Sequence, residues 1–516
     1  MDSQNLNSVP CGKKVPDGIL KMRDNYYFFG ILSLLYGLIF GICTYYNLHN
    51  VMTIVLTVST QAFIIAALIF FKLKIGFKTI MCLLAWLLLA VSSSMTTNFS
   101  IIFFNTIGMS LLFATFLLIH FCDTKKWGLG KFMIEIIKLP FISLIHFVNP
   151  FIDFAKRRKR PENQKSKTIG YICIGISLSV LILLIVIPLL TSADAVFKNI
   201  FSFIKLPRYW IKCVIFGIFG WLASYGVFSY MVSDYVDSKI KDHKRFNAIV
   251  AVSCTIPITI VYLIFSIIQI SFLFIGGFEL PEGYTYAKYA REGFFQLLAV
   301  CIINIIILMI CLKLFEDNKI LKAILTLFSL CTGIMVASSA MRMLLYIESY
   351  ELTMLRVMVL WSLVVISFLL IGCIITIYKQ SFPLFNYGTI MISILYILFA
   401  ISNPAVQITK FNLNYDGIED INYLKEELAS DSIPELDKKG IVEETFFSAK
   451  AEYEKYKDTK ISNLYDYDYY YYESIWDTNE IPYMWKKTYD DYKKMNLFNF
   501  NLSTYKAGKI LDKYAQ

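Results

Sequence analysis

Charged side chains are scarce in this chain. Of its 516 residues only 17% are Asp, Glu, Lys or Arg, whereas 57% are hydrophobic, and the mean hydropathy is +0.57. So few charges do not cover the surface of a water-soluble protein of this length. The shortage excludes a soluble globular protein and predicts an integral membrane protein.

Metal-binding and disulfide patterns are also lacking. The four histidines stand far apart, and the eleven cysteines are scattered singly without a Cys-x-x-Cys spacing. We therefore expect no metal site, no cofactor and no disulfide framework. The stretch from 408 to 516 contains neither His nor Cys, which excludes a Ser-His-Asp or Cys-His catalytic set within it.

Long apolar runs are the main feature that the sequence does contain. Runs of about 18 or more mostly apolar residues are typical of membrane-spanning helices. Eleven are found, at 26–47, 51–71, 78–96, 99–121, 169–191, 209–232, 248–275, 294–315, 322–347, 354–378 and 388–407. We predict an all-α polytopic transmembrane helix bundle with a small α-rich C-terminal tail domain outside the cytoplasm.

Very few polar residues separate the run at 78–96 from the run at 99–121. Those residues are Thr96, Thr97 and Asn98. Such a short connection permits only a tight helical hairpin.

Orientation follows from lysine and arginine, which stay on the cytoplasmic side of short connections. The connection at 122–168 carries eleven of them and is placed inside; the connection at 192–208, with three, opposes this assignment. No small-residue cleavage site follows the first run, so we expect that run to remain as an anchor. An odd number of spans then puts the N-terminus in the cytoplasm and the tail outside.

These considerations divide the chain into five parts. We expect a cytoplasmic segment at 1–25, four spans in 26–121, a basic amphipathic loop at 122–168, a seven-span core in 169–407 and a tyrosine-rich tail at 408–516. The tail contains fifteen tyrosines and two helix-like pieces, at about 420–429 and 443–458.

The basic loop contains the apolar stretch GKFMIEIIKLPFISLIHFVNPFIDFA followed by KRRKR. We interpret the stretch as too short, and too interrupted by Pro140 and Pro150, to span, and expect it to lie in the membrane interface. The basic cluster fixes topology, or binds anionic lipid head groups at about 1 kcal/mol per residue, or binds nucleic-acid phosphate. We favour the first reading and expect no nucleic acid partner; the lipid-binding candidates are Lys156, Arg157, Arg158, Lys159 and Arg160.

Acids, arginines and tyrosines gather in three connections on the predicted outer side. A charge near the centre of a spanning helix costs about 2.5 to 3.5 kcal/mol, so an arginine there requires a partner or a purpose. Arg342 shares a helical stripe with Ser339 and Tyr346 and is expected about 7 to 8 Å below the outer end at Ile347, with Arg356 at nearly the same depth. The ligand-binding candidates are Asp194, Glu279, Arg291, Glu292, Arg342, Tyr346 and Arg356.

Several interpretations of this outer cluster remain open. The tyrosines form an aromatic belt, and Arg291 and Arg356 snorkel to head groups. Arg342 and Glu292 form an ion pair between helices or a ligand site, with Gln296 extending it by one turn. Five polar residues inside spans are expected to form hydrogen bonds between helices: Gln61, Asn105, Gln269, Gln296 and Asn304.

Four stretches together resemble a known family. They are SADAVF, FELPEGYTYAKYAREGFFQLLAV, ASSAMRMLLYIESYELTMLRV and NLNYDGIEDINYLKEELASDSIPEL, within about 185–436. In combination they are similar to bacterial multi-pass membrane proteins with domain of unknown function 4173 and its relative 4153. The chain departs from that pattern at Glu351, where the family usually has glycine, which argues against a special backbone angle at this turn. The resemblance implies a bacterial cell membrane protein and no particular activity.

Three functions are compatible with these features. We rank first a non-enzymatic envelope sensor or scaffold that binds a ligand or partner at its outer face, with an envelope protein or a glycan as partner of the tail. The alternatives are a transporter or channel for a small solute, and a membrane enzyme acting on lipid-linked envelope substrates. No motif specifies a reaction, and besides these partners we expect only the lipid bilayer.

Overall fold

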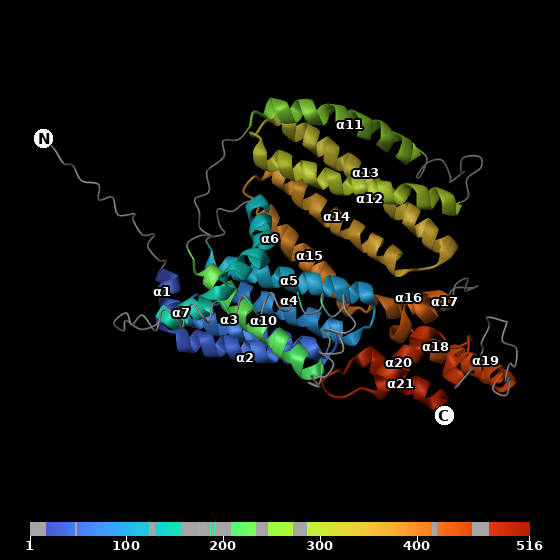
Figure 1. Cartoon of the computed structure of the whole chain (residues 1–516). Helices are drawn as coiled ribbons and strands as arrows, with labels where there is room; N and C mark the ends of the chain where they lie inside the picture. The colour runs from blue at the N-terminus through green and yellow to red at the C-terminus, as the bar shows by residue number, and fades with distance from the viewer. Residues whose placement is uncertain are drawn as a thin grey trace. The chain divides into compact units, whose positions relative to one another are not determined.

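The protein is almost entirely helical wherever its structure is described. The computed structural model describes residues 17–46, 49–122, 129–156, 208–233, 246–271, 286–414, 421–456 and 474–515, together with four single positions between 175 and 190. Its helices are shown in Figure 1. Within these residues, eleven helices are long and apolar enough to cross a membrane. The chain is therefore a multi-pass helical membrane protein, as predicted.

Ten of those helices coincide with predicted spans. They are α2 (Tyr26–Tyr45), α3 (Val51–Phe70), α4 (Phe77–Met95), α5 (Phe99–Phe121), α10 (Arg208–Met231), α11 (Ala248–Ile270), α12 (Tyr286–Leu314), α13 (Lys319–Tyr350), α14 (Met354–Tyr378) and α15 (Leu384–Ile401). The three residues between α4 and α5 confirm the tight hairpin. The predicted span at 169–191 lies outside the described residues apart from the four single positions between 175 and 190.

The eleventh helical stretch, Lys131–Phe154, corrects the expectation that this segment is too short and too broken to span. Helix α6 (Leu129–Ile145) continues through Pro140, and the change of direction comes later, at η2 (His146–Val148) before α7 (Asn149–Lys156). Proline at the second position of α7 fits a first helical turn, where the missing N–H has no helical partner.

Contacts of this segment show a path across one end of α10. The Tyr230 hydroxyl donates to Glu135 near the start of α6, at 3.1 Å, and its ring lies 5.8 Å from that of His146 beyond the end of α6. Further along, Phe147 contacts Phe219. These contacts cover only about 17 Å of α10, compared with about 30 Å for a hydrocarbon core. Length and composition allow a span here, and the contacts show how the segment packs on α10 on both sides of η2.

The chain divides into two compact units. The first contains residues 1–48, 52–87 and 108–240, and the second contains 49–51, 88–107 and 241–516. In the first unit, α2 and α10 approach closely through glycines: a Cβ at Gly37 would lie 2.5 Å from the Gly217 carbonyl oxygen. Small residues permit such backbone contact between helices in lipid.

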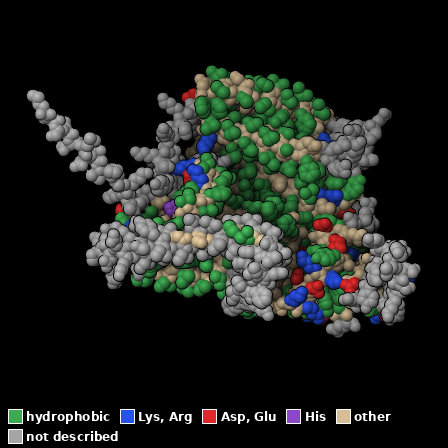
Figure 2. Space-filling view, in the orientation of Figure 1, with side chains coloured by type: hydrophobic (Ala, Val, Ile, Leu, Met, Phe, Trp, Pro, Cys, Tyr) green, Lys and Arg blue, Asp and Glu red, His purple; other side chains and the backbone are tan. Residues whose placement is uncertain are grey.

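The second unit combines the bundle α11–α14 with α15 and the tail. Asparagine side chains start three of its helices by accepting hydrogen bonds from the first turn: Asn98 for α5, Asn247 for α11 and Asn318 for α13. Figure 2 shows hydrophobic side chains over the bundle, whereas Lys, Arg, Asp and Glu concentrate over the tail. The apolar surface suits lipid, and the charged surface suits water.

The tail folds as a helical domain. It comprises α16 (Pro404–Asn412), α17 (Ile421–Glu426), η4 (Ala429–Asp431), α18 (Ile433–Lys438), α19 (Ile441–Tyr456), η5 (Ile475–Asp477), α20 (Tyr483–Lys493) and α21 (Leu502–Tyr514). Its core includes Leu424, Leu436, Val442, Trp485 and Leu511, all fully buried. Both predicted tail helices are confirmed as α17 and α19.

Candidate functional site

Arg342 lies further from the end of its helix, α13, than predicted. Because α13 continues to Tyr350 rather than ending at Ile347, Arg342 is eight residues, or about 12 Å, from its end. Its side chain is buried, and Nη2 donates to Oε1 of Gln269 on α11 at 3.3 Å. The Ser338 hydroxyl donates to the same oxygen at 2.6 Å. The amide of Gln269 thus joins α11 to α13 at this level.

Gly293 on α12 makes room for the guanidinium. A Cβ at this position would lie only 2.1 Å from Nη1 of Arg342. The Ser339 hydroxyl also reaches the Phe294 carbonyl of α12, at 3.5 Å. Three helices therefore enclose Arg342, and a glycine inside the apolar helix α12 is the sequence signal that we missed.

Arg356 closes the end of α13. Its Nη1 donates to the backbone carbonyl oxygens of Tyr350 and Glu351, and its guanidinium carbon lies 4.2 Å from the centroid of the Tyr346 ring. The cation therefore satisfies helix C-terminal carbonyls and contacts an aromatic face. It is buried, which corrects the expectation that it snorkels, and it lies about two helical turns from Arg342.

Glu351 adopts the backbone conformation that the family glycine would favour. Its φ is 65° and its ψ is −174°, a region occupied almost only by glycine. The expectation that the turn needs no special angle is therefore wrong. The turn is retained with glutamate because bonds to its backbone hold it on both sides.

The remaining predicted site residues are not placed beside the arginines by the structure. Asp194 and Glu279 lie outside the described residues, as do Arg157–Arg160 of the basic cluster. Arg291 and Glu292 belong to α12, and Lys156 to α7, but their side chains are outside what is described. Glu292 immediately precedes Gly293 in the sequence. Because its side chain is outside what is described, its pairing with Arg342 stays a prediction.

Interhelical hydrogen bonds confirm four of the five polar residues expected to join spans. Asn304 accepts from Tyr262 at 2.8 Å and donates to Thr332 at 3.0 Å, which links α11, α12 and α13. Gln269 bonds Ser338 and Arg342, Asn105 bonds Ser92, Ser93 and Tyr396, and Gln61 bonds the Leu83 carbonyl. Gln296 is exposed, so the idea that it extends the Arg342 site is wrong.

A buried carboxylate in the tail was missed by the sequence analysis. Asp431 accepts hydrogen bonds from the Thr96 hydroxyl at 2.7 Å, the Thr97 amide at 3.1 Å and Asn403 at 3.3 Å. Nearby, Asn501 donates to the carbonyls of His49 and Thr96. The tail therefore docks on the connections before α3 and α5.

The tail also covers the turn between α13 and α14. The Asn412 side chain accepts from the Leu352 amide and donates to the Leu352 carbonyl, both at 3.0 Å. The Tyr423 hydroxyl accepts from the Met354 amide at 2.7 Å. The turn that carries Glu351 is thus held by side chains from α16 and α17.

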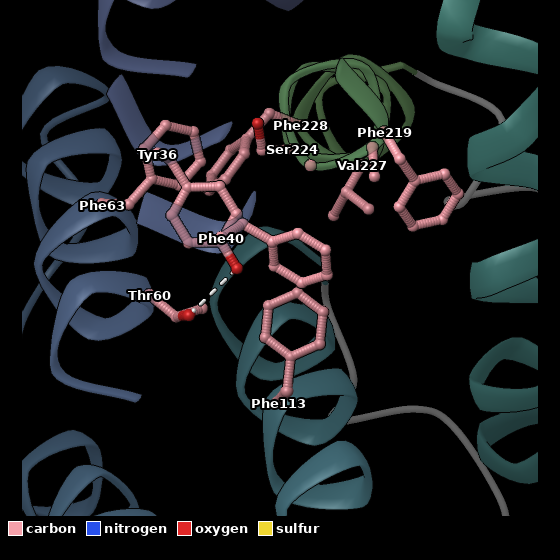
Figure 3. A pocket seen from close by; sticks show the side chains of 11 residues that line it. Tyr36, Phe40, Thr60, Phe63, Phe113, Phe219, Ser224, Val227 and Phe228 are labelled. Carbon is pink, nitrogen blue, oxygen red and sulfur yellow. Dashed lines mark hydrogen bonds between the residues drawn. The ribbon is translucent and has the colours of Figure 1, made fainter. Parts of the chain in front are cut away.

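The first unit contains a small cavity (Figure 3). Its volume is about 140 Å³, and its walls include the rings of Phe40, Phe113 and Phe219 and the Tyr36 hydroxyl, which bonds Thr60 at 3.1 Å. Small-molecule sites usually occupy about 300 to 1,000 Å³, so this space is too small for a typical substrate. None of the predicted site residues lines it.

A buried polar cluster of the first unit ties α1 (Asp17–Asp24) to α7 and α10. Asp153 is bonded by Nε of Arg23 at 3.0 Å and by the Tyr225 hydroxyl at 2.9 Å. An acid inside an apolar segment was the signal that could have revealed it. Among the residues that the structure describes, no group of three or more His, Cys, Asp and Glu could hold a metal ion.

A family model matches much of the chain. Residues 82–439 match the family model described as Domain of unknown function (DUF4153). No curated protein and no solved structure matches the chain. The match extends well upstream of the segment that carried the resemblance and covers more than half of the sequence. The protein therefore belongs to the DUF4153 family.

Proposed function

We propose that this protein is an envelope sensor or scaffold that binds a ligand or partner on its predicted outer side. The observation that carries the proposal is the two-way hydrogen bonding between Asn412 of the tail and Leu352 of the α13–α14 turn. A folded domain bonded in this way to a turn between two spans transmits its movements to them.

The contacts continue from the turn towards the membrane. Arg356 binds the last carbonyls of α13 and contacts the Tyr346 ring, and Arg342 lies one helical turn before Tyr346 on the same helix. A shift of the tail would therefore move α13 relative to Gln269 of α11. In this proposal the ligand or partner meets the tail and the outer connections, including Asp194, Glu279, Arg291 and Glu292.

Amide hydrogen exchange in lipid nanodiscs tests the coupling. An envelope fraction that slows exchange in the tail should also slow exchange at 350–356 in the parent protein, but not in Asn412→Ala. Gln407→Ala is the matched control, because Gln407 is exposed on the same helix. Protection that stays confined to the tail of the parent protein would contradict the proposal.

A small-solute transporter is the second candidate, favoured by polar side chains at two levels of α11–α13. One level holds Tyr262, Asn304 and Thr332, and the other holds Gln269 with Arg342. The hydrogen bonds within each level favour helix packing over a path for solute. Solute flux into proteoliposomes above that of protein-free liposomes, lost in Asn304→Leu, would instead support transport.

A further inference from the structure

The loop between α20 and α21 presents apolar side chains on an otherwise charged domain. Leu497 is 79% exposed and Phe498 is 47% exposed. Asparagines on both sides shape the tip: Asn496 accepts from the amides of Phe498 and Asn499, and Asn499 accepts from the Asn496 amide. These bonds fold a tight turn that holds the two apolar residues outward.

The same loop is tied to the start of a span. The Val51 amide donates to the Phe500 carbonyl at 3.0 Å, and Val51 is the first residue of α3. That helix contains 20 residues, or about 30 Å, which equals the thickness of a hydrocarbon core. This bond places Phe500 at the end of a helix of spanning length, where a membrane boundary is expected.

Exposed aromatic side chains lie beside this point. Phe99, the first residue of α5, is 79% exposed, and it lies three residues beyond Thr96, whose carbonyl binds Asn501. Tyr505 contacts Phe500 and is exposed. Aromatic side chains are enriched at this depth of a bilayer.

We propose that Leu497 and Phe498 insert into the leaflet surrounding the spans, so that the tail is anchored directly to lipid. The bilayer is the occupant that fits, because the exposed tip lies next to a span boundary and continues its apolar surface. The anchor would fix the orientation of the tail independently of its hydrogen bonds to the connections.

Site-specific photo-crosslinking tests this anchor in the full-length protein. A benzophenone side chain is placed at Leu497 or Phe498, and at Phe447 as the control, in vesicles of phosphatidylethanolamine and phosphatidylglycerol. Phe447 is 77% exposed on α19, whose contacts are with other tail elements. Mass spectrometry should find lipid adducts at the first two positions at least tenfold more often than at the third.

Other results would overturn the proposal. Equal lipid labelling at all three positions would show that the tip has no special access to lipid. Adducts of the tip to a second copy or another protein, without lipid adducts, would show that a protein covers it. Melting of each labelled protein in detergent should match the parent, which confirms that the comparison concerns folded protein.

Discussion

Replacing Glu351 by glycine should stabilise the turn between α13 and α14. A non-glycine residue in this backbone region costs about 1 to 3 kcal/mol. Glycine removes that cost but gives the unfolded chain more freedom, which returns about 0.4 to 1 kcal/mol. We therefore expect a net gain in backbone free energy of about 1.3 kcal/mol, the difference between the midpoints of these two ranges.

The side chain has to be separated from the backbone, because Glu351 is buried and takes part in contacts of its own. Glu351→Ala removes the side chain but keeps the strained conformation, so the difference between Glu351→Gly and Glu351→Ala isolates the backbone effect. Both variants retain the carbonyl that Arg356 binds. The measurement is the free energy of unfolding in mixed detergent. A glycine variant no more stable than the alanine variant would refute the reasoning.

Three further predictions concern packing, pH and topology. Gly293→Ala should lower the melting temperature, because its Cβ would meet the buried guanidinium, whereas Gly333→Ala, with no contact closer than 3.7 Å, should not; equal effects would contradict this packing. Burial raises the pKa of the Asp431 carboxyl above its ordinary value of 3.8. The contribution of Asp431 to stability is therefore fully present below pH 3.8 and is lost as pH rises through the folded-state pKa. Melting between about pH 4 and pH 7 should therefore decline more steeply in the parent than in Asp431→Asn, and parallel curves would exclude the carboxyl as the cause. In a cysteine-depleted background, Lys439→Cys should react with an impermeant thiol reagent in intact cells and Gln380→Cys should not; the reverse pattern would invert the predicted orientation.

Local sequence patterns predicted the spans and the two tail helices well. Apolar length alone identifies helices such as α12 and α14, and polar residues inside spans, such as Asn304, are forced to find partners because lipid offers none. The segment at 131–154 shows the limit of this reasoning. Its length and composition resemble those of a span, and only its contacts with Tyr230 reveal that it bends across one end of α10.

The candidate site was predicted less completely. An arginine in a span indicates that a partner exists, but the sequence does not show whether that partner is an acid, an amide or a carbonyl. Arg356 binds backbone carbonyls, which every residue carries, and Arg342 binds Gln269 of another helix. The Asp431 network joins segments 335 residues apart, a pairing that no local pattern encodes.

Asn501 has a consequence for biosynthesis. It binds the carbonyl of His49, which lies 452 residues earlier in the chain, and the carbonyl of Thr96. The early helices therefore enter the membrane with these carbonyls still bonded to water, and the carbonyls acquire this partner only after residue 501 has been translated. A chain truncated before Asn501 would keep its spans but leave the carbonyls of His49 and Thr96 without this hydrogen-bond donor.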